Sequence, residues 1–141
     1  MVNNILNAIT IQLGKTFGND YKYHVEDVKQ GLIRPCFTVD VIVPLERSKR
    51  TVLYDRTMPV VIHYFHDSDT DVKKVGYSMA EQVIECLEYL PFLNTTLRGE
   101  NISWQMVDDV LQIFITYKFT TTKVVDAEVG MEELSERVSH N

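Results

Sequence analysis

The sequence predicts an α+β fold: an antiparallel or mixed β-sheet of four to five strands, with an N-terminal helix and a longer central helix packed on one side. Two segments carry apolar residues at helical spacing, and several others alternate apolar and polar residues as half-buried strands do. The 141 residues, 45% of them hydrophobic, match one domain around one core. The expected order is helix, three strands, helix, two strands.

The first element is expected to be a helix. Apolar residues recur at spacings of three and four over residues 2–13, which is the pattern of one buried helix face. Gly14 or Gly18 is expected to end this helix, because glycine accepts the left-handed backbone found at helix C-termini. Residues 21–28 then alternate tyrosine or valine with polar side chains, which predicts a half-exposed strand.

Two longer strands are expected next, as a hairpin or meander. Pro35 can precede a strand without needing an amide hydrogen, and residues 36–45 alternate strictly. A polar loop at 46–50 leads to a second strand over residues 51–66. The apolar faces of the two strands comprise Phe37, Val39, Val41, Val43 and Leu45, and Met58, Val60, Ile62 and Tyr64.

The second helix is expected to be the longer one. Residues 67–70 are all good helix N-caps, and apolar residues follow at helical spacing from Val72 to Leu90. Pro91 is expected to stop this helix, because its ring cannot continue the hydrogen-bond ladder.

Two more strands should complete the sheet. After a polar loop at 94–101, residues 102–106 alternate as a strand, and Asp108 and Asp109 turn the chain into another strand over 111–119. The sequence shows no internal repeat or linker, so residues 1–123 are interpreted as one domain. Residues 124–141 are acidic and weakly periodic, and they are expected to form a flexible tail or a short helix.

Composition narrows the class of partner. The net charge of −6 argues against a general nucleic-acid or acidic-membrane binder, because both need a cationic surface. No stretch approaches a membrane span and MVNNIL is not a signal sequence, so synthesis in the cytoplasm is expected. Cys36 and Cys86 lie in apolar segments outside any CxxC pair, and they are interpreted as reduced, buried, inert thiols.

The sequence holds none of the common catalytic or cofactor motifs, so we expect neither an enzyme nor a cofactor. The crowded segment 63–71 is the best candidate for a metal site. His63 and His66 would point to opposite faces of a strand, however. A calcium loop starting at its first aspartate would need glycine and glutamate where Val72 and Ser78 stand. A strand end followed by a helix cap explains the segment better.

Charge is distributed unevenly along the chain. Acidic residues gather at 67–71, 81–88 and 126–136. These charges can be ordinary solvated surface, or a basic hairpin on one subunit can meet an acidic surface on the next, a head-to-tail contact that closes into rings. The basic residues near the first hairpin are Arg34, Arg47, Lys49, Arg50 and Arg56.

Two segments carry a resemblance to a known family. Residues 30–39 read QGLIRPCFTV, and residues 56–65 read RTMPVVIHYF. With the order of elements over residues 1–122, they resemble the small tail terminator (tail completion) proteins of tailed phages. The similarity is greatest to those of Gram-positive phages and prophages with contractile tails, including phage-tail-like bacteriocins.

The resemblance implies a structural protein that forms a hexameric ring on the tail tube, stops tube polymerisation and offers a docking face to the head connector. Its partners would be itself, the tail tube protein and the neck, without a membrane or sequence-specific nucleic-acid contact. It would lie in the bacterial host cytoplasm during assembly and then at the head-proximal end of the virion tail. Another head–tail joining protein, or a small ligand-binding domain, stays open as an alternative.

By the same resemblance, the hairpin at 43–54 and the C-terminal segment are the candidates for subunit or tube contacts. The open alternatives are an ordinary exposed turn and a disordered tail. The candidate interface residues are Arg47, Lys49, Arg50, Arg56, Glu132 and Glu133.

Overall fold

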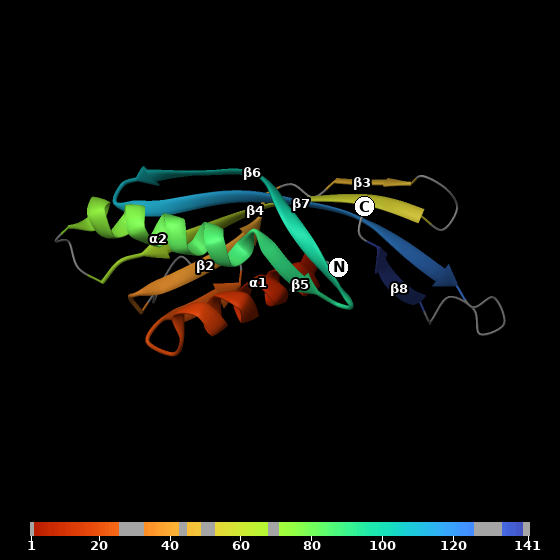
Figure 1. Cartoon of the computed structure of the whole chain (residues 1–141), viewed down its shortest axis with the longest axis horizontal. Helices are drawn as coiled ribbons and strands as arrows, with labels where there is room; N and C mark the ends of the chain where they lie inside the picture. The colour runs from red at the N-terminus through yellow and green to blue at the C-terminus, as the bar shows by residue number, and fades with distance from the viewer. Residues whose placement is uncertain are drawn as a thin grey trace.

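The computed structural model describes residues 2–25, 33–42, 45–48, 53–67, 71–125 and 134–139. Within them the chain forms an α+β fold, as the sequence predicts (Figure 1). The elements in chain order are α1 Val2–Phe17, β1 Lys22–Val25, β2 Cys36–Val41, β3 Leu45–Ser48, β4 Leu53–Phe65, α2 Val72–Leu87, β5 Tyr89–Phe92, β6 Thr95–Val107, β7 Val110–Val125 and β8 Leu134–Ser139.

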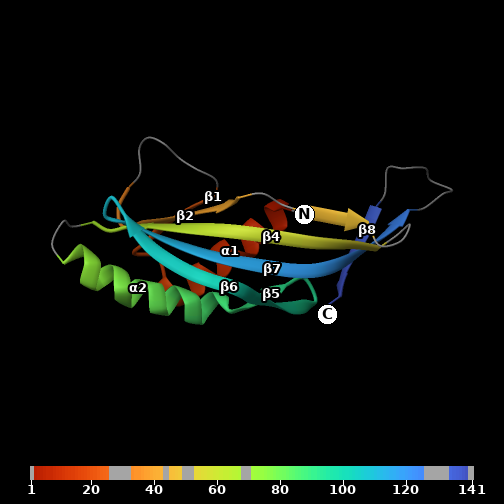
Figure 2. The same ribbon diagram turned by 90° about the horizontal axis from the view of Figure 1, so that it is seen from above.

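In the described part of the chain, eight strands form one sheet in the order β1-β2-β4-β7-β6-β5, with β3 added to β4 and β8 to β7. The β1–β2 pair is parallel and the other pairs are antiparallel, so the sheet is mixed. Both helices lie on one side of it (Figures 1 and 2). The prediction of four to five strands was therefore too low, because segments that looked like loops or a tail also pair.

Strands β4 and β7 form the middle of the sheet, paired from Leu53–Thr122 to Tyr64–Leu111. Their apolar alternation was predicted correctly, because those side chains are buried against the helices. The buried set comprises Met58, Val60, Ile62 and Tyr64 of β4, Leu111, Ile113, Ile115, Tyr117 and Phe119 of β7, Ile5, Leu6, Ile9 and Leu13 of α1, and Met79, Ala80, Val83 and Leu87 of α2.

The predicted strand at 36–45 is interrupted. Strand β2 ends at Val41, and β3 covers 45–48, where the sequence suggested a loop. Both strands pair with β4, but Val41 is opposite Val60 while Leu45 is opposite Thr57, so the register changes by one residue between them. Alternation indicates which face a side chain takes, but it cannot show such a change of register.

Helix α1 ends where expected. Gly18 has a φ of 81°, and its amide donates a hydrogen bond to the Gly14 carbonyl oxygen at 2.9 Å. This is the left-handed ending that glycine favours.

The central helix is not longer than the first, because each has 16 residues. Helix α2 stops at Leu87, and Pro91 lies inside β5 instead of ending the helix. A proline is tolerated there because β5 is at the edge of the sheet.

The expected cap of α2 also differs. Residues 68–70 lie outside the described residues, and the N-cap position is occupied by Asp71. This residue has a φ of 57° and makes no side-chain capping bond within the described structure.

The predicted loop at 94–101 belongs mostly to β6, which has a bulge between Glu100 and Ser103. The Gly99 amide donates a hydrogen bond to the Glu88 carbonyl oxygen at 2.7 Å, just beyond α2. A Cβ at Gly99 would lie 2.7 Å from Cγ2 of Ile115, which is too close. Glycine therefore allows β6 to approach both α2 and β7 closely.

The C-terminal strand was not predicted. Strand β8 pairs with residues 120–125 of β7, where a flexible tail or a short helix was expected. Strand β7 itself runs to Val125, across the predicted boundary at residue 123. Residues 126–133 lie outside the described residues, and the boundary stays a prediction.

A buried hydrogen bond joins α2 to the sheet. The Tyr117 hydroxyl donates to the Leu87 carbonyl oxygen at 2.6 Å, at the last residue of the helix. Burial raises the pKa of the Tyr117 phenol well above its ordinary value. The phenol therefore stays protonated and can donate its hydrogen bond to the Leu87 carbonyl oxygen.

We predict that Tyr117→Phe lowers the free energy of unfolding by about 1 kcal/mol at neutral pH, because it leaves the Leu87 carbonyl unpaired. Above about pH 10 the unfolded chain ionises this tyrosine while the folded protein resists ionisation, so stability falls as pH rises. Tyr117→Phe should reduce that fall. Urea unfolding between pH 7 and 11 measures both effects. The exposed Tyr77→Phe is the control, and equal pH slopes for Tyr117→Phe and the parent protein would contradict the prediction.

Candidate assembly surfaces

The predicted interface residues are placed unevenly. Arg47 lies in β3, where its main chain is opposite Asp55 of β4. Lys49, Arg50, Glu132 and Glu133 lie outside the residues that the structure describes. Their part in an interface stays a prediction.

Arg56 is inside the protomer, at 3% exposure. Its Nε donates a hydrogen bond to Oγ1 of Thr121 at 2.7 Å, across the β4–β7 ladder. On the opposite face of the sheet, the Thr120 hydroxyl donates a hydrogen bond to a carboxylate oxygen of Asp55 at 2.8 Å. An arginine in a strand is ordinarily expected at the surface, and sequence alone could not show that β7 supplies a buried acceptor. This geometry favours a role in the fold over a surface contact.

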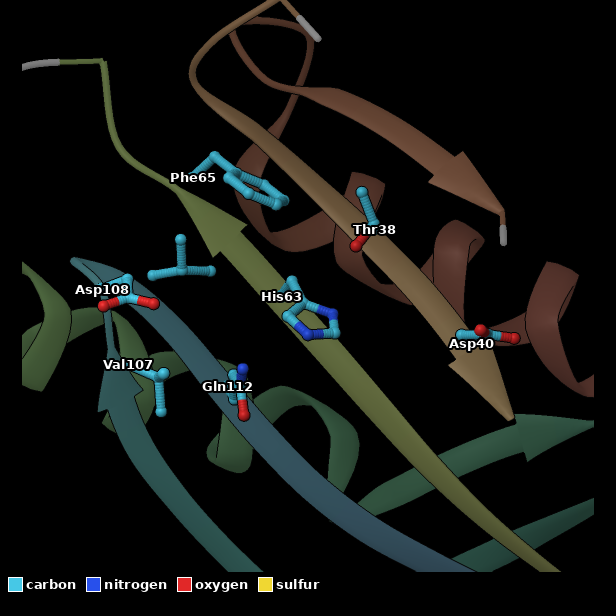
Figure 3. A pocket seen from close by; sticks show the side chains of 8 residues that line it. Thr38, Asp40, His63, Phe65, Val107, Asp108 and Gln112 are labelled. Carbon is cyan, nitrogen blue, oxygen red and sulfur yellow. The ribbon is translucent and has the colours of Figure 1, made fainter. Parts of the chain in front are cut away.

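The sheet face opposite the helices is a second candidate surface. It carries a depression of about 310 Å³ that spans β2, β4 and the β6–β7 turn (Figure 3). Several apolar side chains lie on this face, although the strand pattern assigns it to solvent. Val61 is buried, and Phe65 and Phe114 are half-buried. The depression is lined by Thr38, Asp40, His63, Phe65, Val107, Asp108, Val110 and Gln112.

The depression offers polar and aromatic groups together. The His63 ring stacks on Phe65 with centroids 6.3 Å apart, and the Arg34 guanidinium lies 5.7 Å from the centre of the Phe65 ring. A carboxylate oxygen of Asp40 accepts a hydrogen bond from the Val41 amide at 2.8 Å. Such a mixture suits contacts with side chains of another protein.

The segment 63–71, which was the best candidate for a metal site, does not bring its two histidines together. His63 lines the depression, whereas Nδ1 of His66 lies 3.0 Å from the Tyr64 hydroxyl and 3.6 Å from a carboxylate oxygen of Asp67. Among the described residues, no group of three His, Cys, Asp or Glu side chains is placed to hold a metal ion.

Both cysteines are free thiols, with Cys36 buried and Cys86 half-buried. Burial raises the pKa of each thiol, and the nearby Arg34 offsets part of this effect at Cys36. A raised pKa favours the protonated thiol, which is a poor nucleophile.

The helix side carries a second groove, of about 320 Å³, between α1 and the β5–β6 turn. Its rim includes the exposed Ile11 and Leu93. Another exposed apolar surface lies where α2 passes β6. There the ring centroids of Tyr77 and Trp104 are 5.3 Å apart. One signal for these surfaces was present in the sequence, because Ile11 and Tyr77 are out of phase with the buried faces of their helices.

Comparison with known proteins identifies the family. A family model described as phage tail terminator protein matches residues 4–128, from the first turn of α1 to just beyond β7. The chain belongs to the phage tail terminator family. The resemblance inferred from residues 30–39 and 56–65 is thereby confirmed for the family. No curated protein matches the chain.

Membership assigns this terminator protein a structural role in a phage tail, in contact with other tail proteins. Its place is accordingly the virion tail. In the described part of the chain, neither helix is long and apolar enough to cross a membrane. The surfaces described above are candidates for those contacts.

We predict that Arg56→Ala lowers the free energy of unfolding by about 2 kcal/mol, because it removes a buried hydrogen bond from a charged group. The matched control is Lys118→Ala on β7. The exposed Lys118 Nζ lies 3.9 Å from Oε2 of Glu100, and this surface ion pair should contribute little to the free energy of unfolding. Urea unfolding of both variants tests this. Unchanged stability in Arg56→Ala, combined with weaker subunit association, would instead make Arg56 an interface residue.

Proposed function

We propose that this protein terminates the phage tail. In this proposal it forms a ring, expected to be a hexamer, which caps the tail tube, stops its polymerisation and provides the face to which the head or neck attaches. The family match over residues 4–128 is the observation that carries the proposal.

The proposed partners are other copies of the chain, the tail tube protein and the head–tail connector. The protein would be in the host cytoplasm during assembly and at the head-proximal end of the finished tail. We further propose a contractile tail of the Gram-positive type, from a phage, prophage or phage-tail-like bacteriocin, because the segments at 30–39 and 56–65 resemble that group. The role needs neither an enzymatic reaction nor a cofactor.

The structure supports the proposal through its surfaces. A ring subunit that also caps a tube needs lateral contacts with its neighbours and two further faces for the structures above and below. The sheet supplies two unlike edges, and its faces differ because the helices cover only one of them (Figures 1 and 2). The open face and the α1–β5 groove both hold exposed or half-buried apolar groups.

Two alternatives can be separated from this proposal. Another small head–tail joining protein would use similar surfaces, so only the identity of the bound partner distinguishes it. A small ligand-binding domain would use the depression around His63 and Asp40, and binding of a small molecule there would favour it.

The decisive test is tail length. We predict that tails assembled without this protein are longer than normal and variable in length, because nothing stops the tube from growing. Electron microscopy of lysates with and without the gene product measures this, and adding the purified protein during assembly should restore a single length. Tails of normal length that lack heads would indicate a joining role instead.

The basic hairpin can be tested separately. Reversing the charge of Arg47, Lys49 and Arg50 to glutamate should weaken subunit association at least tenfold at low salt, because like charges then meet across the contact. Sedimentation velocity at several protein concentrations measures the association. The matched control reverses three exposed charges elsewhere, at Lys15, Arg98 and Lys118. Equal effects of the two triple variants would contradict a specific role for the hairpin.

A further inference from the structure

Part of strand β6 forms an open sheet edge. Strand β5 pairs with β6 only over residues 95–98, whereas residues 103–107 pair with β7 on one side. In the described part of the chain, no strand pairs with residues 103–107 on the other side. Figure 2 shows this length of β6 at the margin of the sheet, beside α2.

The main chain at this edge is positioned to pair. Asp108 and Asp109 have positive φ angles of 52° and 63°, so they form the two-residue turn in which the flanking Val107 and Val110 are a hydrogen-bonded pair. Hydrogen-bonded and non-hydrogen-bonded pairs alternate along an antiparallel ladder. The N–H and C=O groups of Met106 and Trp104 therefore point away from β7.

This edge lacks the residues that usually prevent strand pairing. Proteins protect exposed edges with lysine, proline or very short strands. Strand β5, which borders the first part of β6, is protected in this way, because it has only four residues and includes Pro91. Residues 103–107 read SWQMV, without a charge or a proline. Residues 103–107 therefore lack the usual protection against pairing with another strand.

Exposed aromatic side chains accompany the open edge. Trp104 is 39% exposed, and its ring packs in a tilted arrangement against Tyr77 of α2, which is 51% exposed, with centroids 5.3 Å apart. Val107 is 40% exposed. Tyrosine and tryptophan are among the residues most enriched in the energetic centres of protein interfaces. The outward-pointing N–H and C=O groups of β6 thus lie beside an exposed aromatic pair that a partner strand could contact.

The opposite edge of the same sheet complements this one. Strand β1 is the terminal strand on that side. It carries Lys22 at its start and no acidic residue, whereas β6 ends at Val107 and is followed directly by Asp108 and Asp109. Antiparallel pairing would bring the start of β1 beside the end of β6 and so join these charges. It would also place Tyr23 and Met106 on the same side of the sheet, as their pairings with Phe37 and Leu111 require.

We propose that residues 103–107 of β6, with Tyr77 and Trp104, bind the β1 edge of a second copy of this chain, so that the sheet continues from one subunit to the next. The two edges differ, so the contact is head-to-tail and repeats around a ring. This inference rests on the ring proposed above and names the surfaces that build it.

Paired cysteines test the geometry directly. Lys22→Cys combined with Val107→Cys should form disulfide-linked ladders on mild oxidation, because directly opposite residues lie within disulfide range. Lys22→Cys with Ser103→Cys is the matched control and should not link, since the two positions would be four residues out of register. The parent protein, which retains Cys36 and Cys86, gives the background. Linking is measured on the free protein and on protein bound to tail tubes.

A second variant tests the edge without cysteines. Trp104→Lys places a charge in the open strand and should weaken association at least tenfold in sedimentation, whereas Trp104→Phe keeps an aromatic ring and should have a smaller effect. Circular dichroism verifies that both variants fold.

The outcomes separate this proposal from the proposed function. Absence of the Lys22–Val107 link in free and tube-bound protein, or linking through Ser103 instead, overturns the edge contact even if overlong tails establish the terminator role. Ladders linked through Lys22 and Val107 support the edge contact even if tail length does not depend on the protein.

Discussion

The antiparallel ladder between β4 and β7 is the constraint on which the rest of the structure depends. It joins segments that are far apart in the sequence, from Leu53–Thr122 to Tyr64–Leu111. Its alternation turns one continuous row of apolar side chains toward the helices. Strands β2 and β3 then attach to β4, and β6 and β8 attach to β7. Without this ladder, the helices would have no apolar sheet surface to pack on, and the outer strands would have no partner.

Buried hydrogen bonds hold α2 and the neighbouring strands in place on the β4–β7 ladder. At one end of α2, the bonds from Tyr117 to the Leu87 carbonyl and from Gly99 to the Glu88 carbonyl hold the helix terminus against β6 and β7. Farther along the ladder, Arg56 bonds to Thr121. Unpaired polar groups are costly in a core, so these bonds favour one arrangement of helix and sheet. A rigid protomer suits the ring proposed above, in which every subunit would make the same contacts.

The surfaces follow from the same arrangement. Both helices lie on one face of the sheet, and in the described part of the chain the other face has a depression around His63 and Asp40. Because β5 pairs with only part of β6, one sheet edge remains open beside an exposed aromatic pair. Family membership gives the protein a structural role in a phage tail, where it contacts other tail proteins. The sheet edges and faces are thus more informative about function than any single polar cluster.

The sequence by itself determined the α+β class, the buried faces of α1, β4 and β7, the turn at Asp108 and Asp109, and the family. Those features are local, because periodicity and turn residues are written in neighbouring positions. Only the tertiary structure decided that residues 45–48, 89–92 and 134–139 are strands, since each is a strand through its pairing with a neighbouring strand, β4, β6 or β7. It also decided that Arg56 is buried and that residues 103–107 lie at an open edge. Burial and edge position depend on which strands pair, and pairing is a property of the whole sheet.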